Sequence, residues 1–167
     1  MKTSKMTHQN DEDVLMSFFD RQCIYEIPIY QRNYKWGNKK INQVLTDFDE
    51  ILDDQKEVHF FGAMIFYQVP STGNKPTTNE VIDGQQRITT IYLFLLAYAY
   101  VLRKYDLENA RDFFLTKLTR IGLKTENSTL RPSKEDRGQL NWIFGQIIKP
   151  KNFSDILGND TYRAFPT

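Results

Sequence analysis

A nearly continuous apolar stretch in the middle of the chain, residues 88 to 102, restricts most strongly what this sequence can fold into. It is too long for an ordinary strand, and as a helix it would carry apolar residues around most of its circumference. The stretch is short for a membrane span, and threonines and tyrosines interrupt it. We therefore expect a buried helix that starts at Gln85 or Gln86 and ends near Tyr105.

Shorter patterns predict the elements around this helix. Acidic residues followed by an apolar stripe indicate a helix over 11–22, and a capping residue, Asn38, precedes a second stripe that ends at Leu52. The other expected elements are a strand at 23–27, a hairpin of strands at 60–68 and 80–83, a helix at 108–119, a loop or short strand near 128–132, and a helix to residue 148 that starts from a capping box at 133–136. This order predicts an α/β or α+β fold, with a small mixed sheet, helices packed around it and a helical C-terminal half.

The composition fits one globular domain over residues 1–167, with 40% hydrophobic and 26% charged residues. A net charge of +1 gives no overall basic field for nucleic acid. A single cysteine, Cys23, excludes an internal disulfide framework and suits a reducing cytoplasm, where we expect the protein to reside. No clean stop is visible over 150–167, so we interpret the chain as the N-terminal fragment of a longer protein with a truncated boundary there.

A polar cluster, Asp83-Gly84-Gln85-Gln86-Arg87, lies between an expected strand and the buried helix. This geometry points unpaired backbone N–H groups and the positive end of the helix dipole at a ligand, and Gly84 lets that ligand approach closely. Arg87 adds a cation where the dipole slightly disfavours one, which indicates an anionic ligand such as phosphate. The two glutamines would bind phosphate or orient a water, and Asp83 would hold Mg²⁺, position water or pin Arg87.

The same residues also have an ordinary structural explanation. Asp83 would then be the helix N-cap, Arg87 its ion-pair partner, and the two glutamines solvated residues of the first turn. The cluster taken alone leaves the two interpretations open.

A second cluster, from Pro28 to Trp36, follows an earlier strand. Arg32 and Lys35 alternate there with three aromatic residues, a mixture suited to base stacking beside phosphate contacts. Alternatively, the aromatic residues cover the core, which is the better explanation for Trp36 and weaker for the Gln31-Arg32 pair.

Three motifs in order resemble the N-terminal domain of the GmrS-type restriction proteins. They cover about residues 24 to 100 and read IPIYQRNYKW, FFGAMIF and VIDGQQRITTIYLFLLAY, and TLRPSKEDRGQL is similar to a weaker downstream segment of that family. The family is distantly similar to the ParB and sulfiredoxin superfamily, which implies a fold of that type and a nucleotide site at these motifs. The pattern carries over onto these positions: Tyr30, Gln31, Arg32, Trp36, Gly62, Asp83, Gly84, Gln85, Gln86, Arg87 and Thr89.

The resemblance implies a nucleotide-binding, NTP-hydrolysing regulatory domain of a DNA restriction or phage-defence system, with Mg²⁺ and a nucleoside triphosphate as its ligands. DNA and an HNH-type nuclease domain or subunit are the implied partners, and DNA cleavage is not expected of these residues alone. We expect Asp83, Gln85, Gln86 and Arg87 to be catalytic. Nucleotide and phosphate binding would fall to Tyr30, Gln31, Arg32, Trp36, Gly84, Arg87 and Thr89. The rival hypothesis is a binding module without hydrolysis, which senses a DNA backbone through the same pocket.

Four further features have ordinary explanations. His59 is expected to be a strand-edge residue, the acidic run 47–54 a solvated helix face, and Cys23 a buried small side chain. Arg131 and Asp136 are either a capping pair or part of the site.

Overall fold

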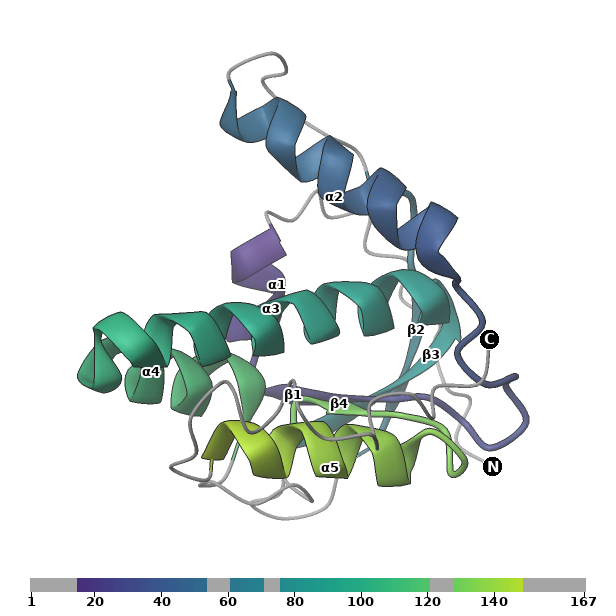
Figure 1. Cartoon of the computed structure of the whole chain (residues 1–167). Helices are drawn as coiled ribbons and strands as arrows, with labels where there is room; N and C mark the ends of the chain where they lie inside the picture. The colour runs from purple at the N-terminus through teal and green to yellow at the C-terminus, as the bar shows by residue number, and fades with distance from the viewer. Residues whose placement is uncertain (1–14, 54–60, 71–75, 121–127, 149–167) are drawn as a thin grey trace, which may run out of the picture.

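The computed structural model describes residues 15–53, 61–70, 76–120 and 128–148. Within these ranges it contains a four-stranded mixed sheet and five α-helices, which confirms the α+β prediction (Figure 1). No helix in this part of the chain is long and apolar enough to cross a membrane.

The sheet brings together two chain segments that are distant in sequence. Its strands are β1 (Cys23–Glu26), β2 (Ile65–Val69), β3 (Thr77–Asp83) and β4 (Leu130–Arg131), in the order β2-β3-β1-β4. Strand β1 runs parallel to both β3 and β4, whereas β2 and β3 form the expected antiparallel hairpin. Because β1 and β3 are adjacent and parallel, the chain leaves both strands at the same edge of the sheet. The two polar clusters follow these two strand ends, so the topology brings them together.

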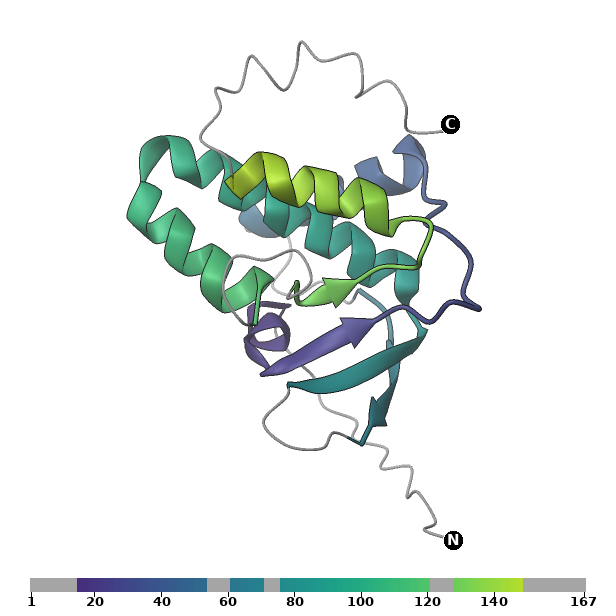
Figure 2. The same ribbon diagram turned by 90° about the horizontal axis from the view of Figure 1, so that it is seen from below.

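The longest helix, α3 (Gln85–Tyr105), organises the helical part of the molecule. Helix α5 (Arg137–Ile148) packs beside it, and α2 (Asn38–Leu52) crosses above its N-terminal end (Figures 1 and 2). The remaining helices are α1 (Leu15–Asp20) and α4 (Leu107–Phe113), and α4 continues into a π-helical turn, Phe114–Leu118.

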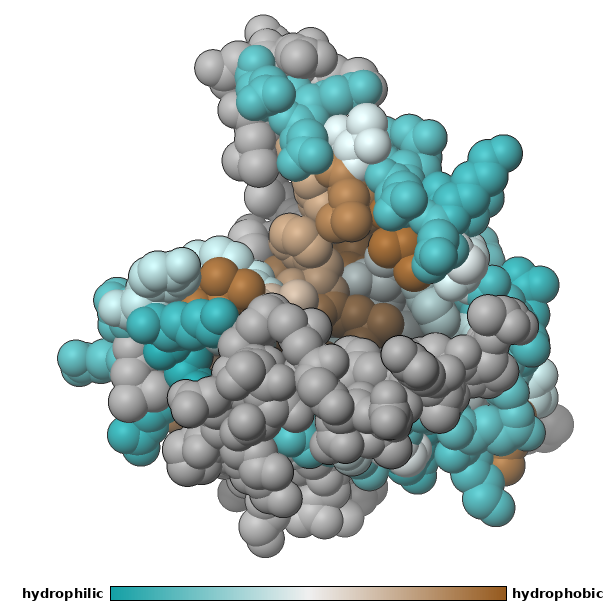
Figure 3. Space-filling model, viewed as in Figure 1, coloured by the Kyte–Doolittle hydropathy of each residue, from teal (hydrophilic) through white to brown (hydrophobic). Residues whose placement is uncertain are grey.

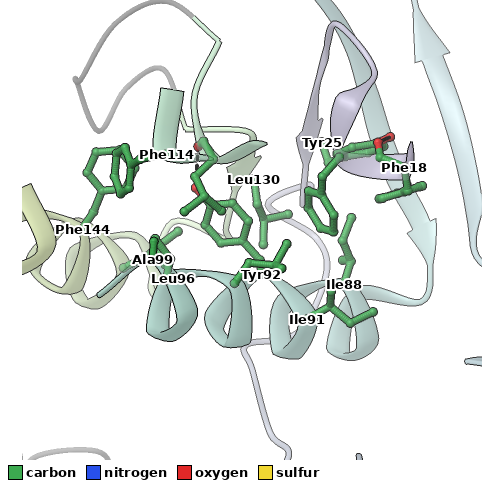
Figure 4. Packing of buried hydrophobic residues seen from close by; sticks show 14 of the residues in the cluster. Phe18, Tyr25, Ile88, Ile91, Tyr92, Leu96, Ala99, Phe114, Leu130 and Phe144 are labelled. Atoms are coloured by element: carbon green, nitrogen blue, oxygen red, sulfur yellow. Dashed lines mark hydrogen bonds between the residues drawn. The ribbon is translucent and has the colours of Figure 1, made fainter. Parts of the chain in front are cut away.

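The core forms where α3 faces β1 and α1 (Figure 4). Ile88 and Tyr92 of α3 and Tyr25 of β1 are completely buried, and the ring of Phe18 stacks on Tyr25 with 4.4 Å between centroids. Each such side chain contributes on the order of 1.5–3 kcal/mol through burial. The buried hydroxyls of the two tyrosines donate to backbone carbonyls, Tyr25 to Phe18 at 3.1 Å and Tyr92 to Leu118 at 2.8 Å, so neither is left unpaired.

Helix α3 is less completely buried than its sequence predicts. Residues 85–93 are buried or half-buried, but the rest of the helix exposes Phe94 by 37%, Tyr98 by 47% and Tyr105 by 83%. A helix of 21 residues is about 32 Å long at 1.5 Å per residue, whereas a strand of seven residues spans only about 23 Å. The helix therefore extends beyond the sheet that covers it.

Several predicted boundaries are wrong: β3 begins at Thr77 and not at residue 80, and two further differences have local causes. The expected strand at 60–68 begins only at Ile65, because Gly62 has a φ of +89°, which interrupts the extended backbone. Asn38 is the first helical residue of α2 and not its cap, since the carbonyl of Gly37 accepts from the amides of Lys40 at 3.0 Å and Ile41 at 3.2 Å.

Other predictions are confirmed. Strands β1 and β4 lie where they are expected, and α3 has the predicted bounds. Cys23 is buried in β1. The amide of Asp136 donates to the hydroxyl of Ser133 at 3.4 Å, which is one of the two bonds of a capping box, and α5 starts directly afterwards at Arg137. His59 and residues 11–14, 54 and 150–167 lie outside the described ranges.

Candidate functional site

A hollow of about 430 Å³ lies beside the ends of β1 and β3. Its lining consists of Gln31, Arg32 and Trp36 from the first cluster and all five residues of the second, 83–87. Two motifs that lie fifty residues apart in sequence thus share one cavity. Ligands of open α/β sheets bind at this kind of place, beyond the carboxyl ends of adjacent parallel strands.

Gly84 forms the turn between β3 and α3. It is the N-cap residue of α3, its φ is +91°, and no side chain caps the helix start. A Cβ atom here would lie 2.5 Å from Cγ of Met64, so the turn requires glycine for both its conformation and its close packing. Asp83 is therefore not the N-cap. The first backbone amides of α3 and the positive end of its dipole remain available at the hollow.

Arg87 is held against the segment that precedes β2. Its Nη2 donates to the carbonyl of Ala63 and lies 3.6 Å from a carboxylate oxygen of Asp83, which confirms the predicted ion pair. A Cβ atom on Gly62 would come within 2.9 Å of Nη1, so that glycine makes room for the guanidinium. The Nε atom is buried and has no partner among the described residues. One N–H of a fixed guanidinium is thus buried and unsatisfied in a residue that lines the hollow.

Gln86 joins the two clusters through three hydrogen bonds. Its Oε1 accepts from the amides of Lys35 at 2.7 Å and Trp36 at 3.2 Å, and its Nε2 donates to the carbonyl of Asn33 at 3.2 Å. Gln85 donates in the same way to the carbonyl of Arg32. Sequence reasoning assigned both carboxamides to phosphate or water. The structure instead bonds them to the backbone of the 31–36 loop, so they position that loop.

The 31–36 loop is also fixed from two other directions. Nε2 of Gln31 donates to the carbonyl of Ile82, at the end of β3, at 3.1 Å. On its other side, the amide of Tyr34 donates to Oδ2 of Asp136 at 2.8 Å. Asp136, which also accepts from the hydroxyl of Ser133 at 2.9 Å, therefore connects the start of α5 to the loop. The sequence did not predict that Asp136 would hold the loop. The only signal was an aspartate at a position where a capping box usually has Glu or Gln.

The side chain of Tyr34 attaches the loop to α3. Its hydroxyl is hydrogen-bonded to Oγ1 of Thr90 at 2.8 Å. Partial burial raises the pKa of this phenol above its usual value, and the bond to Thr90 opposes that rise only in part. Tyr34 therefore stays protonated and neutral at physiological pH.

Arg32 differs from its neighbours because it is exposed. Its guanidinium lines the hollow and makes no hydrogen bond or ion pair with any described residue. The structure thus presents one fixed arginine, Arg87, and one unengaged arginine at the same cavity.

Other predicted site residues lie outside the hollow. Tyr30 is 70% exposed, and Thr89 is buried in α3 with an Oγ1 that has no partner among the described residues. Arg131 lies 3.8 Å from a carboxylate oxygen of Glu26 on the neighbouring strand. The binding roles of Tyr30 and Thr89 remain predictions.

Asp83 is the only acidic residue that lines the hollow within the described ranges, and its side chain is 68% exposed. The same ranges contain no group of three or more His, Cys, Asp or Glu residues with metal-site geometry. One exposed carboxylate fits Mg²⁺, which proteins commonly hold through one or two carboxylates, substrate phosphates and water.

The chain matches the family model for the GmrSD restriction endonuclease, N-terminal domain, over residues 15–164. The chain belongs to this family. No curated protein matches the chain. The GmrSD match confirms the resemblance carried by the three sequence motifs, and the first and third of these supply the lining of the hollow. The more distant relation to ParB remains a prediction.

Proposed function

We propose that this GmrSD N-terminal domain binds a nucleoside triphosphate with Mg²⁺ in the hollow and hydrolyses it, and that this step regulates a DNA-restricting nuclease. One observation carries the proposal: Arg32, Arg87 and the uncapped start of α3 converge on one cavity. All three favour negative charge, and Asp83 is the single carboxylate among the lining residues that the structure describes.

Each group has a role that follows from its geometry. Arg87 is fixed by Ala63 and Asp83, so its remaining N–H groups can bind phosphate oxygens with little loss of side-chain entropy. Arg32 is unengaged and would close on the outer phosphates as a second clamp. The amides that follow Gly84 would stabilise charge that builds up on the transferred group.

Asp83 would hold Mg²⁺ or position the attacking water. Mg²⁺, when bound, would neutralise part of the phosphate charge. Gln85 and Gln86 act one step away from the ligand, since their carboxamides fix the loop that carries Arg32 and Trp36. They are positioning residues in this account.

The family places the domain in a restriction system, and its partners follow from that assignment. We propose that DNA is the target and that an HNH-type nuclease domain or subunit performs cleavage. In this arrangement the nucleotide site controls the nuclease.

A second candidate is a sensor of the DNA backbone without hydrolysis. The observation that favours it is the exposed rim beside the hollow, where Ile29 is 78% and Tyr30 70% exposed next to Arg32. An aromatic side chain next to a free arginine suits a strand of nucleic acid. DNA affinity that falls with salt and with Arg32→Gln, without nucleotide turnover, would support this candidate.

Phosphate release from Mg²⁺-bound GTP, ATP, CTP and UTP tests the proposal. Arg32→Gln should lower turnover by about 10- to 100-fold, as expected for the loss of a charge-assisted contact. Arg111→Gln, at an exposed position on α4, is the matched control and should leave turnover unchanged. No turnover with any nucleotide would contradict hydrolysis, and equal loss in both variants would contradict the role of Arg32.

A further inference from the structure

A second cavity, of about 160 Å³, lies between α2 and the start of α3. Its apolar lining consists of Trp36, Phe61, Val44 and Ile91, and hydrophobic residues gather on the side of α2 that faces α3 (Figure 3). The cavity shares Trp36 and Arg87 with the larger hollow. The two cavities therefore adjoin, with Trp36 and Arg87 between them.

We propose that the smaller cavity is the nucleobase subsite of this nucleotide site. The inference rests on the proposed function, and adds where the base lies and which side chains contact it. Phosphates would occupy the polar hollow beside Arg87 and Arg32, and the base would insert between α2 and α3 against Trp36. A nucleotide has two matching parts, because it joins a charged chain of phosphates to a flat base with a polar edge.

The walls of the smaller cavity are fixed before any ligand binds. The amide of Trp36 donates to Gln86 at 3.2 Å, which holds the tryptophan backbone in place. The Phe61 ring, which also lines the cavity, lies 5.2 Å from that of Phe48, which in turn stacks on Phe94 at 4.7 Å. Fixed aromatic walls favour a planar ligand, because little side-chain freedom is lost when it binds.

The polar side of the cavity comes from α2. Nε2 of Gln43 donates to Oδ1 of Asp47 at 3.0 Å, one helical turn away, and Lys40 completes this side. A carboxylate accepts several hydrogen bonds, so Asp47 can bond a base N–H in addition to its present partners. A ring between apolar walls with a polar edge on one side is the usual environment of a bound base.

Water in this cavity meets an apolar wall as well as a polar one. A volume of about 160 Å³ holds roughly five water molecules, and four of the nine lining residues are apolar or aromatic. Water next to such walls makes few hydrogen bonds, and its displacement by a flat ring is favourable.

The test compares Mg²⁺-bound nucleoside triphosphates with inorganic triphosphate, which has no base, by calorimetric titration of the whole chain. Val44→Phe fills the cavity, and Trp36→Leu removes the stacking surface. Each should weaken nucleotide binding by about 5- to 150-fold, the range for the loss of one base–aromatic stack. Val44→Phe should also leave triphosphate binding unchanged, because Val44 does not line the hollow. Leu45→Phe is the matched control for Val44→Phe, because the neighbouring Leu45 is 41% exposed and does not line the cavity.

Three results would overturn the inference in distinguishable ways. If nucleotides and triphosphate bind equally and neither variant changes this, the base lies elsewhere and the phosphate site stands. Loss of triphosphate and nucleotide affinity together in Val44→Phe would mean that the variant disturbs the hollow, and the base subsite would be rejected. Failure of the unsubstituted chain to bind triphosphate or any nucleotide would overturn the proposed function as well.

Discussion

Replacement of Gln86 by leucine tests whether this residue is structural or catalytic. Gln86 is only 8% exposed and makes three hydrogen bonds to the backbone of Asn33, Lys35 and Trp36. Each bond contributes about 1 kcal/mol, and water replaces part of the loss because the loop is half-exposed. Gln86→Leu should therefore lower the free energy of unfolding by about 2–3 kcal/mol, which lowers Tm by about 4–12 °C in a chain of this size.

Urea denaturation and amide hydrogen exchange measure this effect. Protection of the Lys35 and Trp36 amides should fall in Gln86→Leu, because both donate to its Oε1 in the native protein. Gln139→Leu is the matched control, since it makes the same substitution at an exposed position of α5 and should stay within about 0.5 kcal/mol of the native chain. The reasoning is refuted if Gln86→Leu keeps native stability and native protection but loses nucleotide turnover, because that result would make Gln86 a catalytic residue.

Two further predictions concern the turn before α3 and the cap of α4. Gly84→Ala should lower the free energy of unfolding by about 1–3 kcal/mol from backbone strain alone, and its new methyl group should also clash with Met64. Met64→Ala should relieve part of this clash, so thermal unfolding of the single and double variants should show coupling. Strictly additive effects would contradict the contact. Asp106 accepts hydrogen bonds from the amide of Asn109 at 3.0 Å and from the side chain of the same residue, and these bonds lower the pKa of Asp106 below its usual 3.8. The cap therefore stabilises the folded chain fully above that pH, and this stabilisation is lost as the pH falls through the lowered pKa. Asp106→Asn, which cannot titrate there, should lose less stability than the native chain between pH 6 and pH 2 in denaturant unfolding, and equal losses would argue against this cap.

The positions of the two clusters could be predicted because they depend on patterns that the sequence displays. A strand ends at Glu26 and another at Asp83, each followed by polar residues, and a long apolar helix starts directly after the second. Parallel pairing of β1 with β3 then puts both clusters at one edge of the sheet. The sequence contains the strands and the clusters, but only the fold reveals that these two strands are adjacent.

The partners of individual side chains could not be predicted. A glutamine at the start of a helix can face solvent, a ligand or a neighbouring backbone, and the sequence pattern around it is the same in each case. Gln86 is bonded to a loop fifty residues away, and Asp136 to the same loop from the opposite direction, 102 residues away. Such contacts depend on tertiary packing. The late start of β2 has a local cause, the left-handed Gly62, but that conformation serves Arg87, a partner 25 positions further along the chain.

The central claim is that the hollow formed by residues 31–36 and 83–87 binds the phosphates of a nucleotide. Calorimetric titration of the chain with Mg²⁺-bound GTP, ATP, CTP and UTP tests it most directly, with Arg87→Gln and the exposed control Arg111→Gln run in parallel after circular dichroism has established their folding. The account predicts saturable binding of at least one nucleotide to the native chain and to Arg111→Gln, and a loss of at least about tenfold in affinity for folded Arg87→Gln. Binding that is unchanged in folded Arg87→Gln, or no binding of any nucleotide to the folded native chain, would contradict it.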